Sequence, residues 1–246
     1  MLYSSVGLGG ASSYLVVMSY FAISPNFSST IALTLNIMVA GVAFTNYFKN
    51  GHFRFRLLLP FLVTSIPAAL IGGLIKIELP LYQLGLNIVL LFVSFRLLFF
   101  VRPEGGDHQN FQKINYTLAS IIGVVLGLVS GIIGIGGGIF LSPLIILTKW
   151  GNAKQAAATS AAFIVLNSLS GLIGRALGHS LEMGSFGIEM VLIGLIGGII
   201  GSLVGARYLP NRTVQRLLGA VMLLLVMRYG ISLINLPPNS VSFLIK

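Results

Sequence analysis

Six long stretches without a charged side chain limit what this chain can fold into. Asp, Glu, Lys and Arg are all absent from residues 1–48, 57–75, 79–95, 114–148, 155–174 and 190–206. A helix needs about 20 mostly apolar residues to cross roughly 30 Å of bilayer hydrocarbon. The stretches also lack the alternation of apolar and polar residues that marks the strands of a membrane β-barrel. The sequence therefore predicts an all-α, polytopic membrane protein.

The composition supports the same class. Charged residues make up 8% of the chain and hydrophobic residues 56%, whereas an ordinary soluble domain is about 25% charged. A chain this hydrophobic is not expected to be intrinsically disordered. Because it has no Cys, it cannot be a disulfide-stabilised scaffold either. The N-terminus lacks a basic region and a small-residue cleavage site, so we expect no cleaved signal peptide. We expect a multi-pass protein of the cell (inner) membrane.

Hydropathy and turn residues divide the chain into eight hydrophobic segments. We place them at 1–22, 27–48, 56–76, 80–102, 114–148, 153–178, 185–208 and 211–235. The most polar stretch, 103–113, is the expected linker between two repeats at 1–102 and 114–235. Residues 236–246 form a C-terminal tail.

The segment 114–148 is too long for one straight crossing. At 1.5 Å per residue, its length would be about 50 Å as a single helix. It contains the run Gly134–Gly138 and then Pro143, and each Gly disfavours helix by about 1 kcal/mol relative to Ala. We therefore predict a break at these glycines. Unwound backbone inside a membrane is tolerated only where protein or water satisfies it, so the break favours a functional site, with close helix packing alone as the alternative.

Other glycines in this segment follow a different pattern. Gly123, Gly127 and Gly131 recur every four residues, which places them on one face of a helix. Small residues at this spacing let two membrane helices approach closely. We interpret these three as a packing stripe.

The two halves of the chain repeat each other. The matched residues are Gly9 with Gly136, Asn36 with Asn167, Pro80 with Pro210 and Arg96 with Arg228. Their offset stays between 127 and 132, which indicates a duplicated transporter-like architecture with a glycine break at the start of each repeat. The first half has little sequence ahead of its glycines, so we expect its first helix to be abbreviated. Parallel repeats and inverted repeats both fit the sequence, the latter if the glycine segment is re-entrant.

Two motifs resemble a known family. The sequence GIGGGIFLSPLII at 134–146 is followed by AAATSAAFIVLNSLSG at 156–171. Together with the repeat and the eight segments, these residues resemble the TauE/SafE sulfite exporter family over essentially the whole chain. The resemblance implies a transporter of small sulfur-containing anions such as sulfite, thiosulfate or organosulfonates. It does not identify the anion.

Certain residues could bind such an anion with little fixed charge. Backbone N–H groups at a helix N-terminus are suited to anions, and glycine lets the backbone approach closely. Hydroxyl and amide side chains could complete the shell. The predicted binding residues are Gly9, Gly10, Asn36, Gly136, Gly137, Gly138, Thr159, Ser160 and Asn167.

Two charged residues are weaker candidates. Arg175 lies at the end of its helix, where it could attract anions to one mouth or be an ordinary loop cation. Glu189 begins a long apolar run and could couple transport to protons, although an interfacial acid is the simpler interpretation.

Enzyme chemistry has no support in the sequence. No spacing of its three His and five acidic residues assembles a metal cluster or a catalytic triad, and we expect no cofactor or metal. The net charge of +10 is scattered over short loops, which favours anionic lipid headgroups over nucleic acid as partners. A passive anion channel and a non-transport membrane subunit of an enzyme complex remain the alternatives to a secondary transporter. The sequence does not fix the oligomeric state.

Overall fold

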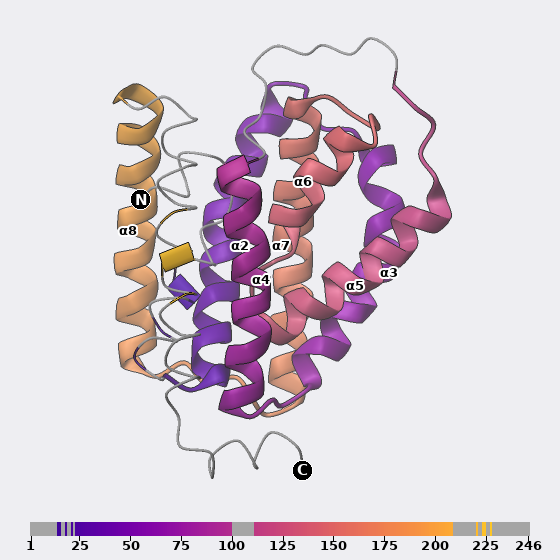
Figure 1. The fold of residues 1–246 in the computed structure, drawn as a ribbon. Coiled ribbons are helices and arrows are strands. Elements are labelled where there is room, and N and C mark those ends of the chain that lie inside the picture. The colour runs from indigo at the N-terminus through magenta and orange to yellow at the C-terminus, as the bar shows by residue number, and fades with distance from the viewer. Residues whose placement is uncertain are drawn as a thin grey trace.

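A computed structural model describes residues 14, 15, 18, 21, 23–99, 111–208, 220, 223, 224 and 227, with backbone alone at 96, 97, 99 and 198–208. Within this part the chain forms helices and no strands, as predicted. The helices are α2 (Pro25–Lys49), α3 (Phe55–Leu74), α4 (Leu79–Phe99), α5 (Tyr116–Ile133), α6 (Gly138–Leu147), α7 (Ala153–Leu177) and α8 (Ser185–Tyr208) (Figure 1).

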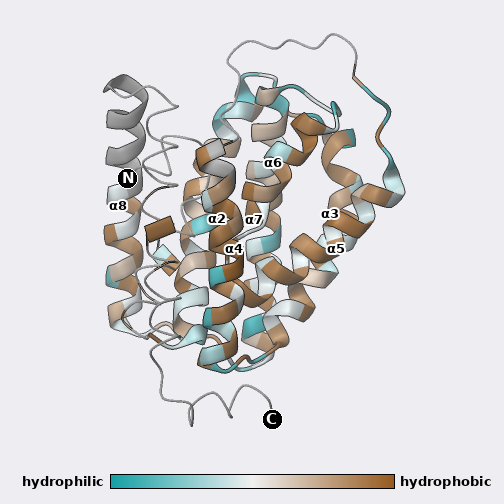
Figure 2. Cartoon of the chain, in the orientation of Figure 1, coloured by the Kyte–Doolittle hydropathy of each residue, from teal (hydrophilic) through white to brown (hydrophobic). Residues whose placement is uncertain are grey.

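Four of these helices are long and apolar enough to cross a membrane: α2, α3, α5 and α7. Shorter apolar stretches cover Leu79–Phe95, Gly138–Leu147 and Ser185–Gly197. Figure 2 shows hydrophobic residues along most of the helical surfaces, with hydrophilic residues frequent in the connections. The predicted segments 1–22 and 211–235 lie almost wholly outside the described residues, so the count of eight stays a prediction.

Side-chain caps explain where three of the helices begin. The Ser24 hydroxyl accepts a hydrogen bond from the Phe27 N–H at the start of α2. Asn115 caps α5, and Asn152 forms a reciprocal capping box with Gln155 at the start of α7. Such caps satisfy N–H groups that have no partner within the helix.

The predicted glycine stripe on α5 is confirmed as a packing surface. A Cβ on Gly123 would lie 2.6 Å from the Phe61 carbonyl oxygen. One on Gly127 would lie 2.8 Å from the Ser65 Cα, and Gly131 is equally close to the α3 backbone. Because these neighbours are backbone atoms, α3 and α5 can approach this closely only where Cβ is missing.

The chain enters α5 and leaves α6 at the same end of the molecule. The Gln112 N–H, just before α5, donates to the Lys149 carbonyl oxygen, just after α6, at 2.9 Å. Figure 1 shows α5 running inward to the centre and α6 returning. The predicted break in 114–148 is therefore confirmed, and after it α6 returns to the end of the bundle from which α5 starts.

Helices α2 and α7 pack against each other in opposite directions. Ser24, at the start of α2, donates to a Glu182 carboxylate oxygen at 2.7 Å, and Glu182 closely follows the end of α7. Helix α7 also packs against α3, α5 and α6, which makes it the central element of the described bundle (Figure 1). The break between α5 and α6 lies against this central helix.

Candidate functional site

The backbone between α5 and α6 takes a conformation that favours glycine. Gly134, Gly136 and Gly137 have φ values of 89°, 78° and 68°, in the left-handed region that L side chains disfavour by about 1–2 kcal/mol. The Gly134 N–H donates to the Ser130 carbonyl oxygen at 2.9 Å, which closes the last turn of α5. Helix α6 then begins at Gly138.

Helices α2 and α7 close on this break from two sides. The Asn36 Nδ2 of α2 donates to the Gly134 carbonyl oxygen at 3.2 Å. On the other side, a Cβ on Gly138 would lie 2.6 Å from the Ser160 carbonyl oxygen of α7. The structure thus brings five of the predicted binding residues together: Asn36, Gly136, Gly137, Gly138 and Ser160.

Thr159 and Asn167 come from the same helix as Ser160. On α7, Asn167 shares a face with Ile164 and Gly171, at helical spacings of three and four residues. Ile164 lies against Gly136 and Gly138, and a Cβ on Gly171 would lie 3.4 Å from the Gly131 Cα. Asn167 therefore faces the α5–α6 region between these two contacts.

Several polar atoms near the break are buried and have no hydrogen-bond partner among the described residues. They are Asn36 Oδ1, Ser130 Oγ, Thr159 Oγ1, Ser160 Oγ, Asn167 Oδ1 and Arg175 Nε, with Ser28, Ser65 and Ser168 Oγ elsewhere in the bundle. Their side chains are at most 2% exposed. Burying a polar group without a partner costs free energy, and most such groups in proteins are paired. This concentration indicates a site for a polar ligand or ordered water.

The start of α6 offers backbone donors to the same region. The N–H groups of Ile135, Gly136 and Gly137 make no hydrogen bond to a described residue, while the Gly138 N–H donates to the Gly136 carbonyl oxygen. The N-terminus of a helix also carries a partial positive charge. The start of α6 therefore offers backbone donors without partners, next to the part of α7 that carries buried hydroxyls, and such donors favour an anion.

The opposite side of the break, the C-terminal end of α5, is capped by other side chains. Arg175 Nη2 of α7 donates to the carbonyl oxygens of Gly131 at 3.1 Å and Ile132 at 2.8 Å. The Tyr82 hydroxyl of α4 donates to the Ile133 carbonyl oxygen at 3.2 Å. These bonds satisfy carbonyls that the end of a helix leaves without partners.

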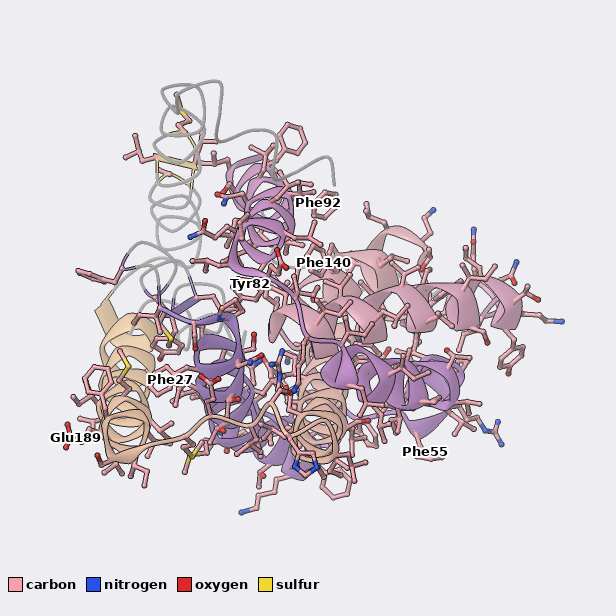
Figure 3. All side chains as sticks on the ribbon, turned by 90° about the horizontal axis from the view of Figure 1, so that it is seen from below. Phe27, Phe55, Tyr82, Phe92, Phe140 and Glu189 are labelled. Carbon is pink, nitrogen blue, oxygen red and sulfur yellow. The ribbon has the colours of Figure 1, made fainter. Side chains whose placement is uncertain are left out.

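Arg175 is consequently not a loop cation. It is 2% exposed and lies inside the bundle, although the sequence places it near the end of its helix. Tyr82 also receives a hydrogen bond from the Ser29 hydroxyl of α2 at 3.3 Å. Figure 3 shows Tyr82 on the side of α4 that faces the other helices.

The remaining predicted site residues do not reach this region in the described structure. Glu189 is exposed on α8 and points away from the bundle (Figure 3). Gly9 and Gly10 lie outside the described residues.

Sequence reasoning missed Tyr82 and Ser130. Ser130 is the only residue from 121 to 141 that is neither apolar nor glycine, and this isolation could have marked it. Tyr82 lies near the start of an apolar helix, and no feature of the sequence distinguishes it from other interfacial tyrosines.

A separate apolar cavity of about 490 Å³ lies between α4, α5 and α6. Its lining is Phe92, Phe95, Ile121, Ile122, Val125, Leu126, Phe140, Pro143, Leu144 and Leu147. The rings of Phe92 and Phe140 are 5.4 Å apart at its edge (Figure 3). No lining side chain is polar, so this cavity does not suit an anion. Among the described residues, no three His, Asp or Glu side chains are grouped to hold a metal.

The family model of the sulfite exporter TauE/SafE matches residues 1–229. The chain belongs to the TauE/SafE family. The resemblance drawn from the motifs at 134–146 and 156–171 is thereby confirmed, and the break described above lies within the matched region. As a TauE/SafE member the chain is a multi-pass membrane transporter and not an enzyme.

Three relatives that match the chain are each named a probable membrane transporter protein. The chain is 31% identical over 224 residues to the probable membrane transporter protein y4hK of Sinorhizobium fredii, covering 91% of this chain and 90% of the relative. It is 27% identical to the probable membrane transporter protein ORF9 of a Sinorhizobium species, over 69% of this chain and 63% of that one. A shorter match, 35% identical over 91 residues, covers 35% of this chain and 34% of the probable membrane transporter protein MJ0441 of Methanocaldococcus jannaschii. No solved structure matches this TauE/SafE chain.

Proposed function

We propose that this protein is a secondary transporter of the inner membrane for small sulfur-containing anions such as sulfite, thiosulfate or organosulfonates, and that the anion binds at the α5–α6 break. One observation carries the proposal. The N–H groups of residues 135–137 at the break, and the hydroxyls of Thr159 and Ser160 on the part of α7 that packs against it, have no partners among the described residues. They are hydrogen-bond donors in a region from which water is largely excluded.

The charge of this arrangement suits transport rather than permanent binding. An anion at the α5–α6 break would be bound by backbone dipoles and hydroxyls. The one described cation nearby, Arg175, already donates to two carbonyl oxygens of α5. The site is therefore positive enough to attract an anion. Part of the Arg175 charge is offset by the negative C-terminal end of α5, which Arg175 caps.

The proposed mechanism is alternating access between two inverted repeats. Helices α2 and α7 are counterparts in the sequence repeat, since Asn36 matches Asn167. Their antiparallel packing supports a repeat axis lying in the membrane plane, because an axis along the membrane normal would keep counterparts parallel. On this proposal the glycines near residue 9 supply the second break, and the substrate lies between the two.

Flux measurements in proteoliposomes test the proposal. We expect saturable sulfite uptake by the wild-type protein. The double variant Thr159→Val, Ser160→Ala should raise the substrate concentration for half-maximal flux by at least about tenfold, because hydrogen bonds to a charged ligand are lost. The matched control is Ser94→Ala, whose hydroxyl is equally buried but donates within α4 to the Leu90 carbonyl oxygen.

A glycine substitution at the break provides an independent test of the site in the same flux assay. Gly137→Ala places a Cβ 2.9 Å from Phe163 Cε1 at a positive φ, so it should reduce flux. Gly41→Ala, which meets nothing within 4 Å, should not. Normal flux in both the hydroxyl double variant and Gly137→Ala would refute the site assignment. A flux that never saturates would favour a channel, and absence of any sulfur-anion flux would favour a non-transport subunit.

A further inference from the structure

Two buried asparagines face the break with one atom each unsatisfied. Asn36 Nδ2 donates to the Gly134 carbonyl oxygen, and Asn167 Nδ2 donates to the Phe163 carbonyl oxygen at 2.9 Å. Because a carbonyl oxygen only accepts, these contacts fix which end of each amide is the nitrogen. The atoms left without a partner among the described residues are therefore both Oδ1. Each side chain is 0% exposed.

An amide oxygen can only accept hydrogen bonds. A fully deprotonated oxyanion, such as sulfate or thiosulfate, likewise presents only acceptors. If such an anion bound beside Asn36 and Asn167, both Oδ1 atoms would stay without a hydrogen-bond donor. The charge of the anion would also lie close to these two partially negative oxygens. A buried acceptor without a donor is costly. The two asparagines thus disfavour an anion that has no proton to offer.

A metal cation would also satisfy amide oxygens, but the charges near the break oppose one. In transporters with broken helices, coupling cations bind the carbonyl groups at the C-terminal end of a half-helix. Here Arg175 donates to those carbonyls, at Gly131 and Ile132. The start of α6 adds a second positive end. The Oδ1 atoms of Asn36 and Asn167 would therefore be satisfied by a hydrogen-bond donor on the ligand itself.

We propose that the break selects a monoanionic sulfur oxyanion that carries its own O–H or N–H donor, as hydrogen sulfite and hydroxy-sulfonates do. The inference rests on the proposed function and narrows its substrate class. The oxyanion end accepts from the amides of residues 135–137 and from Thr159 and Ser160. The ligand's donor binds the Oδ1 of Asn36 or Asn167.

Matched ligands that differ by one hydroxyl test this selection. The probes are 2-hydroxyethanesulfonate against ethanesulfonate, and hydroxymethanesulfonate against methanesulfonate, with sulfate as a donor-free dianion. Calorimetric titration of the purified full-length protein would measure each dissociation constant. We expect the hydroxylated member of at least one pair to bind about tenfold more tightly, because it satisfies a buried acceptor.

Asparagine variants identify the atoms responsible. In Asn36→Leu or Asn167→Leu, the preference for the hydroxylated ligand should fall to about one. The control is Asn87→Leu on α4, because the Asn87 Nδ2 also donates to the carbonyl four residues earlier, that of Gln83 at 2.7 Å, but lies on another helix. This control should keep the wild-type preference.

The outcomes separate two claims: that an anion binds at the break, and that the break selects a ligand with its own hydrogen-bond donor. Equal binding within both pairs overturns the selection of a donor and leaves the anion site standing. The selection of a donor is also overturned if both asparagine variants keep the preference, or if binding requires Na⁺ rather than choline as the counterion. If neither the sulfonates nor sulfite bind at all, the proposed function fails together with this inference. The wild-type comparison decides the question even if a variant does not fold.

Discussion

Arg175 Nη2 lies 2.8 Å from the carbonyl oxygen of Ile132, which joins the end of α7 to the end of α5 inside the bundle. The same nitrogen donates to the Gly131 carbonyl oxygen at 3.1 Å. A helix that ends inside a bundle, away from water, leaves its last carbonyls without partners, so a cation at this position both pairs them and opposes the negative end of the helix. The C-terminal end of α5 is therefore paired by a residue 43 positions further along the chain.

Replacing Arg175 tests this capping role. Arg175→Leu leaves the Gly131 and Ile132 carbonyls without that donor, and we expect the free energy of unfolding to fall by about 2 kcal/mol. Arg175→Gln retains an N–H₂ donor and should lose less. Thermal unfolding in detergent without ligand measures both. An Arg175→Leu protein as stable as the wild type would show that the guanidinium is not needed to end α5.

The glycine stripe of α5 makes a prediction about packing. Gly127→Ala would place a Cβ 2.8 Å from the Ser65 Cα, and forcing the two helices apart should cost about 1–3 kcal/mol. Gly41→Ala on α2 is the matched control, since it meets nothing within 4 Å and gains helix propensity. We expect Gly127→Ala to unfold at lower temperature and Gly41→Ala to be unchanged or slightly more stable. Equal unfolding temperatures would contradict the close approach of α3 and α5.

The return of α6 to the end of the bundle where α5 begins can be tested by labelling, because the chain has no Cys of its own. Gln112 and Lys149 are hydrogen-bonded neighbours at one end of the bundle, and Leu181 lies at the other end, after α7. Single variants Gln112→Cys and Lys149→Cys should react with a membrane-impermeant maleimide from the same side of the membrane. Leu181→Cys should react from the opposite side. Labelling of Gln112→Cys and Lys149→Cys from opposite sides would mean that α5 and α6 together cross the membrane.

The sequence predicts the break and much of the site for clear physical reasons. A run of small residues such as Gly134–Gly138 removes side-chain packing on every helix face, so the break is visible without a structure. The spacing of seven residues between Ser160 and Asn167 likewise places both on one face of α7.

Other features depend on contacts between distant segments. Arg175 follows a charge-free stretch near a helix end, so its sequence position resembles that of an interfacial cation. Its burial is decided by where α5 ends, which the chain near residue 175 does not encode. The return of α6 likewise brings Gln112 and Lys149 together from distant positions in the chain, and charge counts on the loops carried no information about it.

The central claim is that a sulfur anion binds at the α5–α6 break. An experimental structure of the protein determined with sulfite present tests it most directly. The predicted result is anion density within hydrogen-bond distance of the amides of residues 135–137 and of the Ser160 hydroxyl. Anion density elsewhere in the bundle, with only water at the break, would contradict it.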